Sequence, residues 1–115
     1  MPMEYLPATT GALLKQRIGW ITTTREYELL LDTNNQRLLE NNPRRVAVTF
    51  INNGDFRADI STQSTLVAGR GIPIHPGGGT LSILWEEDGT MVSGEFHGKT
   101  VTGQVYLKII EVVLL

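Results

Sequence analysis

Apolar and polar residues alternate on both sides of an Asp-Gly pair in the last third of the chain, at Asp88-Gly89. Asp-Gly between two alternating runs is a strong signal for a two-residue hairpin, because both turn positions favour positive φ. With this turn Leu81 faces Phe96, and a second turn at Gly98-Lys99 adds a third strand that continues to about Leu107. Both turns place the apolar side chains on one face. The pattern therefore predicts a three-stranded antiparallel meander with one dry and one solvated face.

Five further stretches show a β-type pattern. They are residues 18–31, 36–39, 45–52, 56–61 and 72–74. The best of them is 45–52, where Val46, Val48 and Phe50 share one face. Pro73 restricts the last stretch to a short edge strand, because proline cannot donate a ladder hydrogen bond.

The connection at Asn53-Gly54-Asp55 permits two structures. The pattern favours a three-residue hairpin loop with Gly54 in the left-handed region, and a crossing to a second sheet satisfies it as well. Turn residues recur about every 8 to 12 residues along the chain, and this spacing is typical of sandwiches and barrels. The sequence therefore predicts an all-β fold: an antiparallel β-sandwich, jelly-roll-like, or a small barrel, with an N-terminal arm.

The 115 residues suit one domain, and 41% apolar with 19% charged residues is the composition of an ordinary globular protein. Residues 17–115 are expected to form a single β-sandwich domain. Residues 1–16 contain two prolines in their first half and have no clear period, so they are either a frayed terminus or an arm. An arm would dock on a neighbour through its large apolar side chains, which are Tyr5, Leu6, Leu13 and Leu14.

The C-terminal segment, residues 108–115, is apolar on both faces. Ile109 points one way, while Ile110, Val112 and Leu114 point the other way. A strand that is apolar on both faces is buried on both faces. Either the N-terminal region of the same chain covers Ile110, Val112 and Leu114, or a neighbouring subunit does.

Charge and composition exclude several partners. With 10 basic and 12 acidic residues the net charge is −2, so bulk electrostatics give no reason to expect nucleic-acid binding. The absence of cysteine excludes disulfides, thiolate metal sites and cysteine nucleophiles. No apolar run approaches the roughly 20 residues of a membrane span, and the first residues lack the pattern of a secretory signal. We therefore expect neither a membrane nor a nucleic acid as partner.

Candidate metal and catalytic groups are few. Glu95 and His97 lie two apart on one predicted strand face, a spacing that can begin a metal site, with Glu86 as the one possible third ligand. His75 lies in a Gly-Ile-Pro-Ile-His-Pro segment similar to the first cupin motif, but the second histidine and the glutamate of that motif are missing. The serines have no histidine placed beside them as a base. We expect no catalytic, cofactor or metal site, and hence no enzyme.

Arg44 and Arg45 follow a proline-marked turn, with Arg37 nearby. They could form a basic rim for carboxylates or phosphates. A solvated start of a strand is the favoured interpretation.

Three segments carry a resemblance to a known class of proteins. They read Asn-Pro-Arg-Arg-Val-Ala-Val-Thr-Phe-Ile-Asn-Asn-Gly from Asn42, Gly-Ile-Pro-Ile-His-Pro-Gly-Gly-Gly-Thr from Gly71, and Val-Tyr-Leu-Lys-Ile-Ile-Glu-Val from Val105. Over about residues 40–113 the chain resembles small β-sandwich virion proteins encoded by tailed bacteriophages. The resemblance implies a non-enzymatic particle component: a head decoration or cement subunit, or a tail-associated module. No catalytic residue carries over from it.

Three functions follow as hypotheses. The first is a structural virion protein that forms a homo-oligomer, a trimer or larger, and docks on a phage capsid or tail protein. The second is a tail-tip or surface module that binds a carbohydrate or a protein through loops 32–36, 62–71 and 75–80, although these loops contain no Trp, Tyr or Phe. The third is a metal-dependent enzyme around Glu95 and His97.

Overall fold

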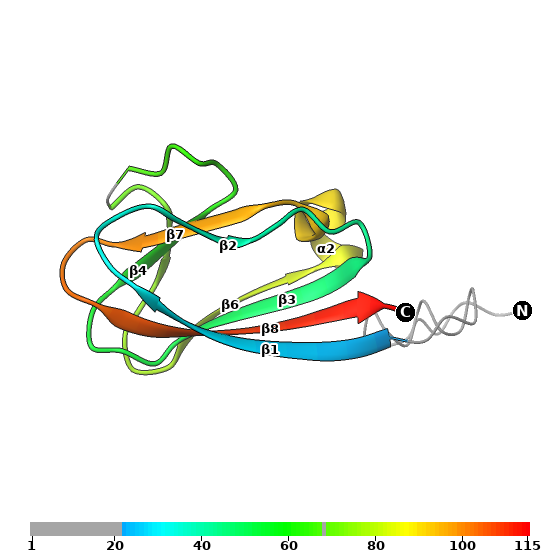
Figure 1. Cartoon of the computed structure of the whole chain (residues 1–115), viewed down its shortest axis with the longest axis horizontal. Helices are drawn as coiled ribbons and strands as arrows, with labels where there is room; N and C mark the ends of the chain where they lie inside the picture. The colour runs from blue at the N-terminus through cyan, green and yellow to red at the C-terminus, as the bar shows by residue number, and fades with distance from the viewer. Residues whose placement is uncertain (1–21, 68) are drawn as a thin grey trace, which may run out of the picture.

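The computed structural model describes residues 22–67 and 69–115, which form two antiparallel sheets of four strands each, packed face to face (Figure 1). The first, which we call the β8 sheet, has the order β1-β8-β3-β6. Its strands are β1 (Thr22–Leu31), β8 (Val105–Leu114), β3 (Arg45–Asn52) and β6 (Gly79–Leu84). The second, the β7 sheet, has the order β2-β7-β4-β5. Its strands are β2 (Gln36–Leu39), β7 (Phe96–Thr100), β4 (Ala58–Ser61) and β5 (Ile72–Ile74). The predicted all-β antiparallel sandwich is confirmed, whereas the predicted arm lies outside the described residues.

The core lies between the two sheets and is built from the inward side chains of both. Phe50 of β3 meets Phe96 of β7 edge to face, with ring centroids 5.3 Å apart, and both rings are fully buried. On β3, Val48 alternates with half-buried Ala47 and Thr49 as the sequence pattern predicts. Such an apolar layer from both sheets is what holds a sandwich together.

The predicted meander is wrong. β6 does not turn back on β7: it pairs with β3 across the full length from Gly79 to Leu84, while β7 pairs with β2 and β4 in the other sheet. Between them lie two helical turns, α2 (Trp85–Asp88) and η1 (Gly89–Ser93), which carry the chain from one sheet to the other at one end of the sandwich (Figure 1). Gly98 and Lys99, expected in a turn, lie within β7.

The Asp-Gly pair does supply a positive φ, but for another purpose. Gly89 has φ 64° and ends α2 as its C-cap, and the Asp88 carboxylate accepts the backbone N–H of Leu84 at 3.0 Å. A glycine with positive φ can serve a helix end as well as a hairpin, so this local signal does not distinguish them. Among the described residues no helix is long and apolar enough to cross a bilayer.

At the end of β3 the chain crosses to the second sheet, so the connection at residues 53–55 is the crossing between sheets and not the hairpin. The hairpin with a left-handed Gly54 is wrong, because Gly54 does not have positive φ. Glycine is required there for close approach: a Cβ on Gly54 would lie 2.5 Å from the Cβ of Val105. Buried Asn52 holds the loop, since its amide donates to the carbonyls of Phe56 and Ile74 at 2.7 and 2.9 Å and its oxygen accepts the N–H of Gly54 at 2.9 Å.

β8 is a central strand and has no free edge. It pairs with β1 along its whole length and with β3 on its other side. Its inward side chains, Val105, Leu107, Ile109, Glu111 and Val113, are all buried. The predicted opposition of Ile109 to Ile110, Val112 and Leu114 is therefore confirmed.

Candidate functional site

An aliphatic patch lies on the outer face of the β8 sheet, at the end where β8 finishes. Ile110, Val112 and Leu114 alternate with the buried residues of β8 and are each half-buried. Ala47 of β3 lies opposite Val112, and Leu84 of β6 lies opposite Ala47, so one aliphatic row crosses three strands. We call Ala47, Leu84, Ile110, Val112 and Leu114 the outer patch.

Polar side chains border the outer patch. The hydroxyls of Thr49 and Ser82 lie 3.1 Å apart on the neighbouring row, and Lys108 pairs with Glu26 at 2.8 Å further along. The hydrogen bond from Lys108 to Glu26 and the negative charge of that carboxylate raise the pKa of Lys108. An aliphatic centre with a charged and hydroxylic border is the usual arrangement of a protein–protein contact surface.

The structure brings together only part of the predicted interface. Ile110, Val112 and Leu114 lie in one line on the outer patch. The other predicted interface residues, Tyr5, Leu6, Leu13 and Leu14, lie outside the described residues.

A cleft opens on the inward face of β1. It is lined by residues of β1, of β2 and of the loop between β2 and β3, and β1 and β2 are edge strands of different sheets. The cleft has a volume of about 310 Å³. Its lining residues are Arg25, Tyr27, Leu29, Leu38, Leu39, Glu40, Asn41, Asn42, Arg45 and Glu111. Arg25 and Tyr27 stand on the inward face of β1, in register with Glu111 and Ile109, yet both are exposed. The sandwich is therefore open at this end.

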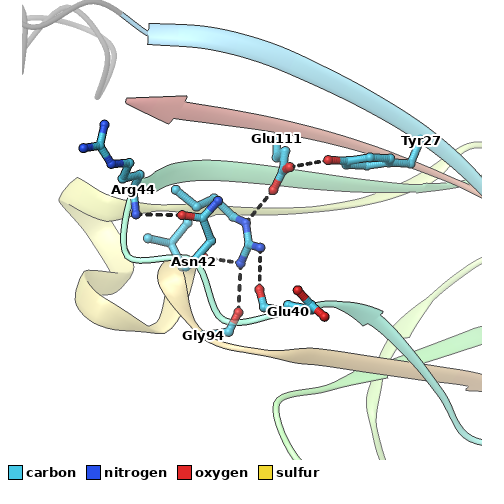
Figure 2. A network of polar contacts seen from close by, with 8 residues as sticks. Tyr27, Glu40, Asn42, Arg44, Gly94 and Glu111 are labelled. Atoms are coloured by element: carbon cyan, nitrogen blue, oxygen red, sulfur yellow. Dashed lines mark hydrogen bonds and ion pairs between the residues drawn. The ribbon is translucent and has the colours of Figure 1, made fainter. Parts of the chain in front are cut away.

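The floor of the cleft is a buried ion pair. Arg45 donates from Nε to Glu111 at 2.7 Å, and the two side chains are only 2% and 3% exposed. The guanidinium also donates to the carbonyls of Val92 at 3.2 Å, Gly94 at 2.8 Å and Glu40 at 2.8 Å (Figure 2). One side chain thus ties β8, the helical connection and the end of β2 together.

A register shift turns Arg45 inward. In the pairing of β3 with β8, Arg45 opposes Val113 and Ala47 opposes Val112, so two steps on β3 match one step on β8. Such a bulge re-aims a side chain, and both Arg45 and Val46 become buried. The expectation that Arg45 lies at a solvated start of the strand is wrong, because Arg45 is buried.

The other two arginines of that prediction remain at the surface. Arg37 pairs with Glu40 at 3.0 Å in an exposed ion pair, and Arg44 is exposed in the loop before β3. The three arginines do not form one basic site.

Tyr27 completes the network from β1. Its hydroxyl donates to Oε1 of Glu111 at 2.7 Å, so both oxygens of the buried carboxylate have a partner (Figure 2). That hydrogen bond, followed by burial and the negative charge of Glu111, raises the pKa of Tyr27, while nearby Arg25 opposes the shift. Tyr27 therefore remains a neutral donor at physiological pH.

Sequence reasoning did not find this network. The available signal was Glu111 itself, because it stands at an inward position of an otherwise apolar strand. A carboxylate at such a position needs a buried cation or several donors. With both oxygens occupied, Glu111 acts as a structural tie between strands.

His97 and Glu95 form a contact of their own. The expectation that His97 lies on a solvated face is wrong: it is buried on β7, and its Nε2 lies 2.7 Å from Oε1 of half-exposed Glu95. Within residues 22–67 and 69–115 no three His, Asp or Glu side chains group in a way that could hold a metal ion.

Two of the three predicted binding loops touch. The side-chain amide of Asn35 donates to the carbonyl of Ser64 at 3.1 Å, joining loops 32–36 and 62–71. The third loop instead binds the β3–β4 connection, where the N–H groups of Gly77 and Gly78 donate to the carbonyls of Gly54 and Asn52.

A scan against models of known protein families finds no match for this chain, and a search of curated proteins finds no similar sequence.

Proposed function

We propose that this protein is a non-enzymatic structural component of a bacteriophage particle, acting by self-association and by docking on a capsid or tail protein. The outer patch carries the proposal. A central strand that presents three half-buried aliphatic side chains outward gains free energy when a partner excludes water from them. The resemblance to phage β-sandwich proteins is the reason to propose a virion as the location of this protein, and a virion protein of this kind is made in the host cytoplasm.

The strand order supports a jelly roll, and we infer that architecture for the sandwich. The order β1-β8-β3-β6 faces β2-β7-β4-β5, and successive strands change sheet at every connection except the one between β4 and β5. Jelly rolls have eight strands in two sheets and are common in viral capsid proteins and in lectins.

The outer patch is too small to be the whole interface. Five half-buried side chains expose on the order of a few hundred Å², whereas a stable interface buries roughly 800 Å² on each partner. A further contact must therefore contribute. The proposed source is the arm, residues 1–16, which carries Tyr5, Leu6, Leu13 and Leu14.

Replacing two centres of the outer patch tests the proposal. Ile110→Thr with Val112→Thr keeps β-propensity but removes aliphatic surface. Half-burial of each side chain in an interface contributes about 1–1.5 kcal/mol, so the pair should weaken self-association roughly 30- to 150-fold. Sedimentation equilibrium of the full chain at about 1 to 100 µM, a range that brackets micromolar affinity, measures the change.

Leu30→Thr is the matched control. Leu30 is an exposed aliphatic residue on the same sheet face, opposite Tyr106 and outside the outer patch. It should leave self-association unchanged. If the double variant associates as strongly as the Leu30→Thr variant, the outer patch is not the interface.

A second candidate function is a module that recognises a carbohydrate or a protein through loops at one end of the sandwich. The hydrogen bond between Asn35 and Ser64 favours it, because it joins two of the three candidate loops into one surface. Glycan-array screening of the full chain separates the two functions: specific hits that are lost when loop 62–71 is changed support the module, and no hits support the structural role.

A further inference from the structure

The cleft beside β1 holds a cation without a counter-charge. Arg25 stands in register with Glu111, but the two oxygens of that carboxylate are occupied by Arg45 and Tyr27. The other acidic lining residue, Glu40, pairs with Arg37. Across residues 22–67 and 69–115, no carboxylate lies within ion-pair distance of Arg25. An anionic group entering the cleft would meet a positive charge at its mouth.

The remaining walls of the cleft suit a short peptide. Leu29 of β1 and the leucines of β2, Leu38 and Leu39, give an apolar wall, while the side-chain amides of Asn41 and Asn42 offer hydrogen bonds. The 310 Å³ correspond to about ten water molecules at roughly 30 Å³ each, so there is room for side chains and not only for an ion.

Among the described strands, β1 also has one edge without a partner. It stands at the margin of its sheet and has 10 residues, compared with 6, 4 and 3 for the other edge strands β6, β2 and β5. A peptide that adds to a sheet edge gains affinity from main-chain hydrogen bonds and specificity from pockets for alternate side chains. The cleft is such a pocket, directly beside the inward side chains of β1.

A second β1 strand is a poor occupant. A two-fold antiparallel pairing centred on any residue from 25 to 28 sets like charges opposite one another: Arg25 on Arg25, Glu26 on Glu26 or Glu28, or Glu28 on Glu28. Like charges directly opposite destabilise a strand pair. Charged side chains of this kind protect an edge against pairing with itself.

The N-terminal segment has the complementary chemistry. Within residues 1–21 the only carboxylate side chain is that of Glu4, which lies between Met3 and Tyr5-Leu6, with Pro2 and Pro7 on either side. In an extended strand Leu6 shares the face of Glu4. One carboxylate for Arg25 and one aliphatic side chain for the leucine wall are what the cleft lacks.

We propose that residues Met3–Leu6 of a neighbouring copy add to the edge of β1, with the Glu4 carboxylate on the guanidinium of Arg25 and Leu6 in the cleft against Leu38 and Leu39. This rests on the proposed self-association and supplies the contact area that the outer patch lacks. An extended stretch of the 21 residues that precede Thr22 spans up to about 70 Å, enough to reach a neighbour.

Cysteine trapping tests the placement in the full chain, which contains no cysteine of its own. A Glu4→Cys variant is mixed with an Arg25→Cys variant under mild oxidation, and heterodimer formation is followed on non-reducing gels. Adjacent strands bring directly opposed Cβ atoms within disulfide reach. The expected initial rate is at least about tenfold above that of the matched mixture with Thr102→Cys, an exposed position in the loop between β7 and β8. Equal rates overturn the placement, and closure only within a chain that carries both cysteines overturns the assignment to a neighbour.

A charge swap tests the ion pair and separates this inference from the proposed function. Glu4→Arg and Arg25→Glu should each weaken self-association about tenfold in sedimentation equilibrium, and the two together should restore it to within about threefold. Weakening by the outer-patch variant with no effect of either charge change overturns the inference and leaves the proposed function standing. A specific disulfide heterodimer in a protein that stays monomeric without oxidant supports the inference and overturns the proposed function.

Discussion

The buried pair of Arg45 and Glu111 makes a quantitative prediction. Glu111→Gln keeps the size of the side chain and leaves an amide oxygen for the guanidinium, but it leaves the positive charge of Arg45 buried without compensation. Removing one partner of a buried ion pair costs about 3–5 kcal/mol. Two features place this pair in that class: a separation of 2.7 Å and side chains only 2% and 3% exposed.

The exposed pair of Lys108 and Glu26 is the matched control. It has nearly the same separation, 2.8 Å, but its side chains are 35% and 57% exposed. Water screens such a pair, so Glu26→Gln should leave the free energy of unfolding almost unchanged. The two variants therefore separate the effect of burial from the effect of distance.

Equilibrium urea unfolding followed by circular dichroism measures both variants, at one fixed protein concentration because self-association stabilises the folded state. A domain of this size has about 5–15 kcal/mol of stability, so the Glu111→Gln variant should still fold and give a measurable transition. A loss below about 1 kcal/mol for Glu111→Gln would refute the reasoning, because it would place the network in contact with water.

Three further predictions concern single side chains. Because the pKa of Tyr27 is raised in the folded state, the stability that Tyr27 contributes is complete below its unfolded pKa of about 10 and is lost as the pH rises through its folded pKa. Between pH 8 and pH 10.5, on either side of about 10, the free energy of unfolding should therefore fall more for the natural chain than for Tyr27→Phe. Tyr106→Phe is the control and should behave as the natural chain does. Gly103→Ala should lower the melting temperature more than Gly89→Ala: both have positive φ, but at Gly103 a Cβ would lie 2.5 Å from a phenylalanine ring, while Gly89 has open space. Asn52→Ala should cost about 3 kcal/mol in urea unfolding, since three hydrogen bonds of a buried side chain are lost, and a cost below about 1 kcal/mol would contradict the account of that loop.

Much of the fold follows from periodicity. The strand at residues 45–52, the short strand at 36–39 and the proline-containing edge strand at 72–74 lie where the pattern predicts them. Apolar residues with a period of two require one buried face, and this requirement is local.

Strand pairing is not local, and the pairing predicted for residues 81–97 is wrong. Leu81 and Ile83 of β6 do face the core, but the partner of β6 is β3 and not the following strand. Two adjacent runs with a turn between them satisfy a hairpin and a crossing between sheets equally well, because the same faces become buried in both. Only the packing of the whole chain decides between them.

The outer patch could be predicted from the sequence in part, and the buried ion pair of the cleft could not. Ile110, Val112 and Leu114 follow from a strand that is apolar on both faces. Ala47 and Leu84 join them only through cross-strand register, which no single segment contains. Arg45 turns inward through a one-residue shift against β8, and bulges of this kind leave no mark in an alternating pattern.

The mass of the full chain in solution tests the central claim most directly. Sedimentation equilibrium of the natural sequence, over a range of about 1 to 100 µM that brackets micromolar affinity, should show a reversible oligomer of three or more copies at the upper end. A single species with the mass of one chain across that range would contradict the account, because the aliphatic face of β8 would then be stable in water without a partner copy.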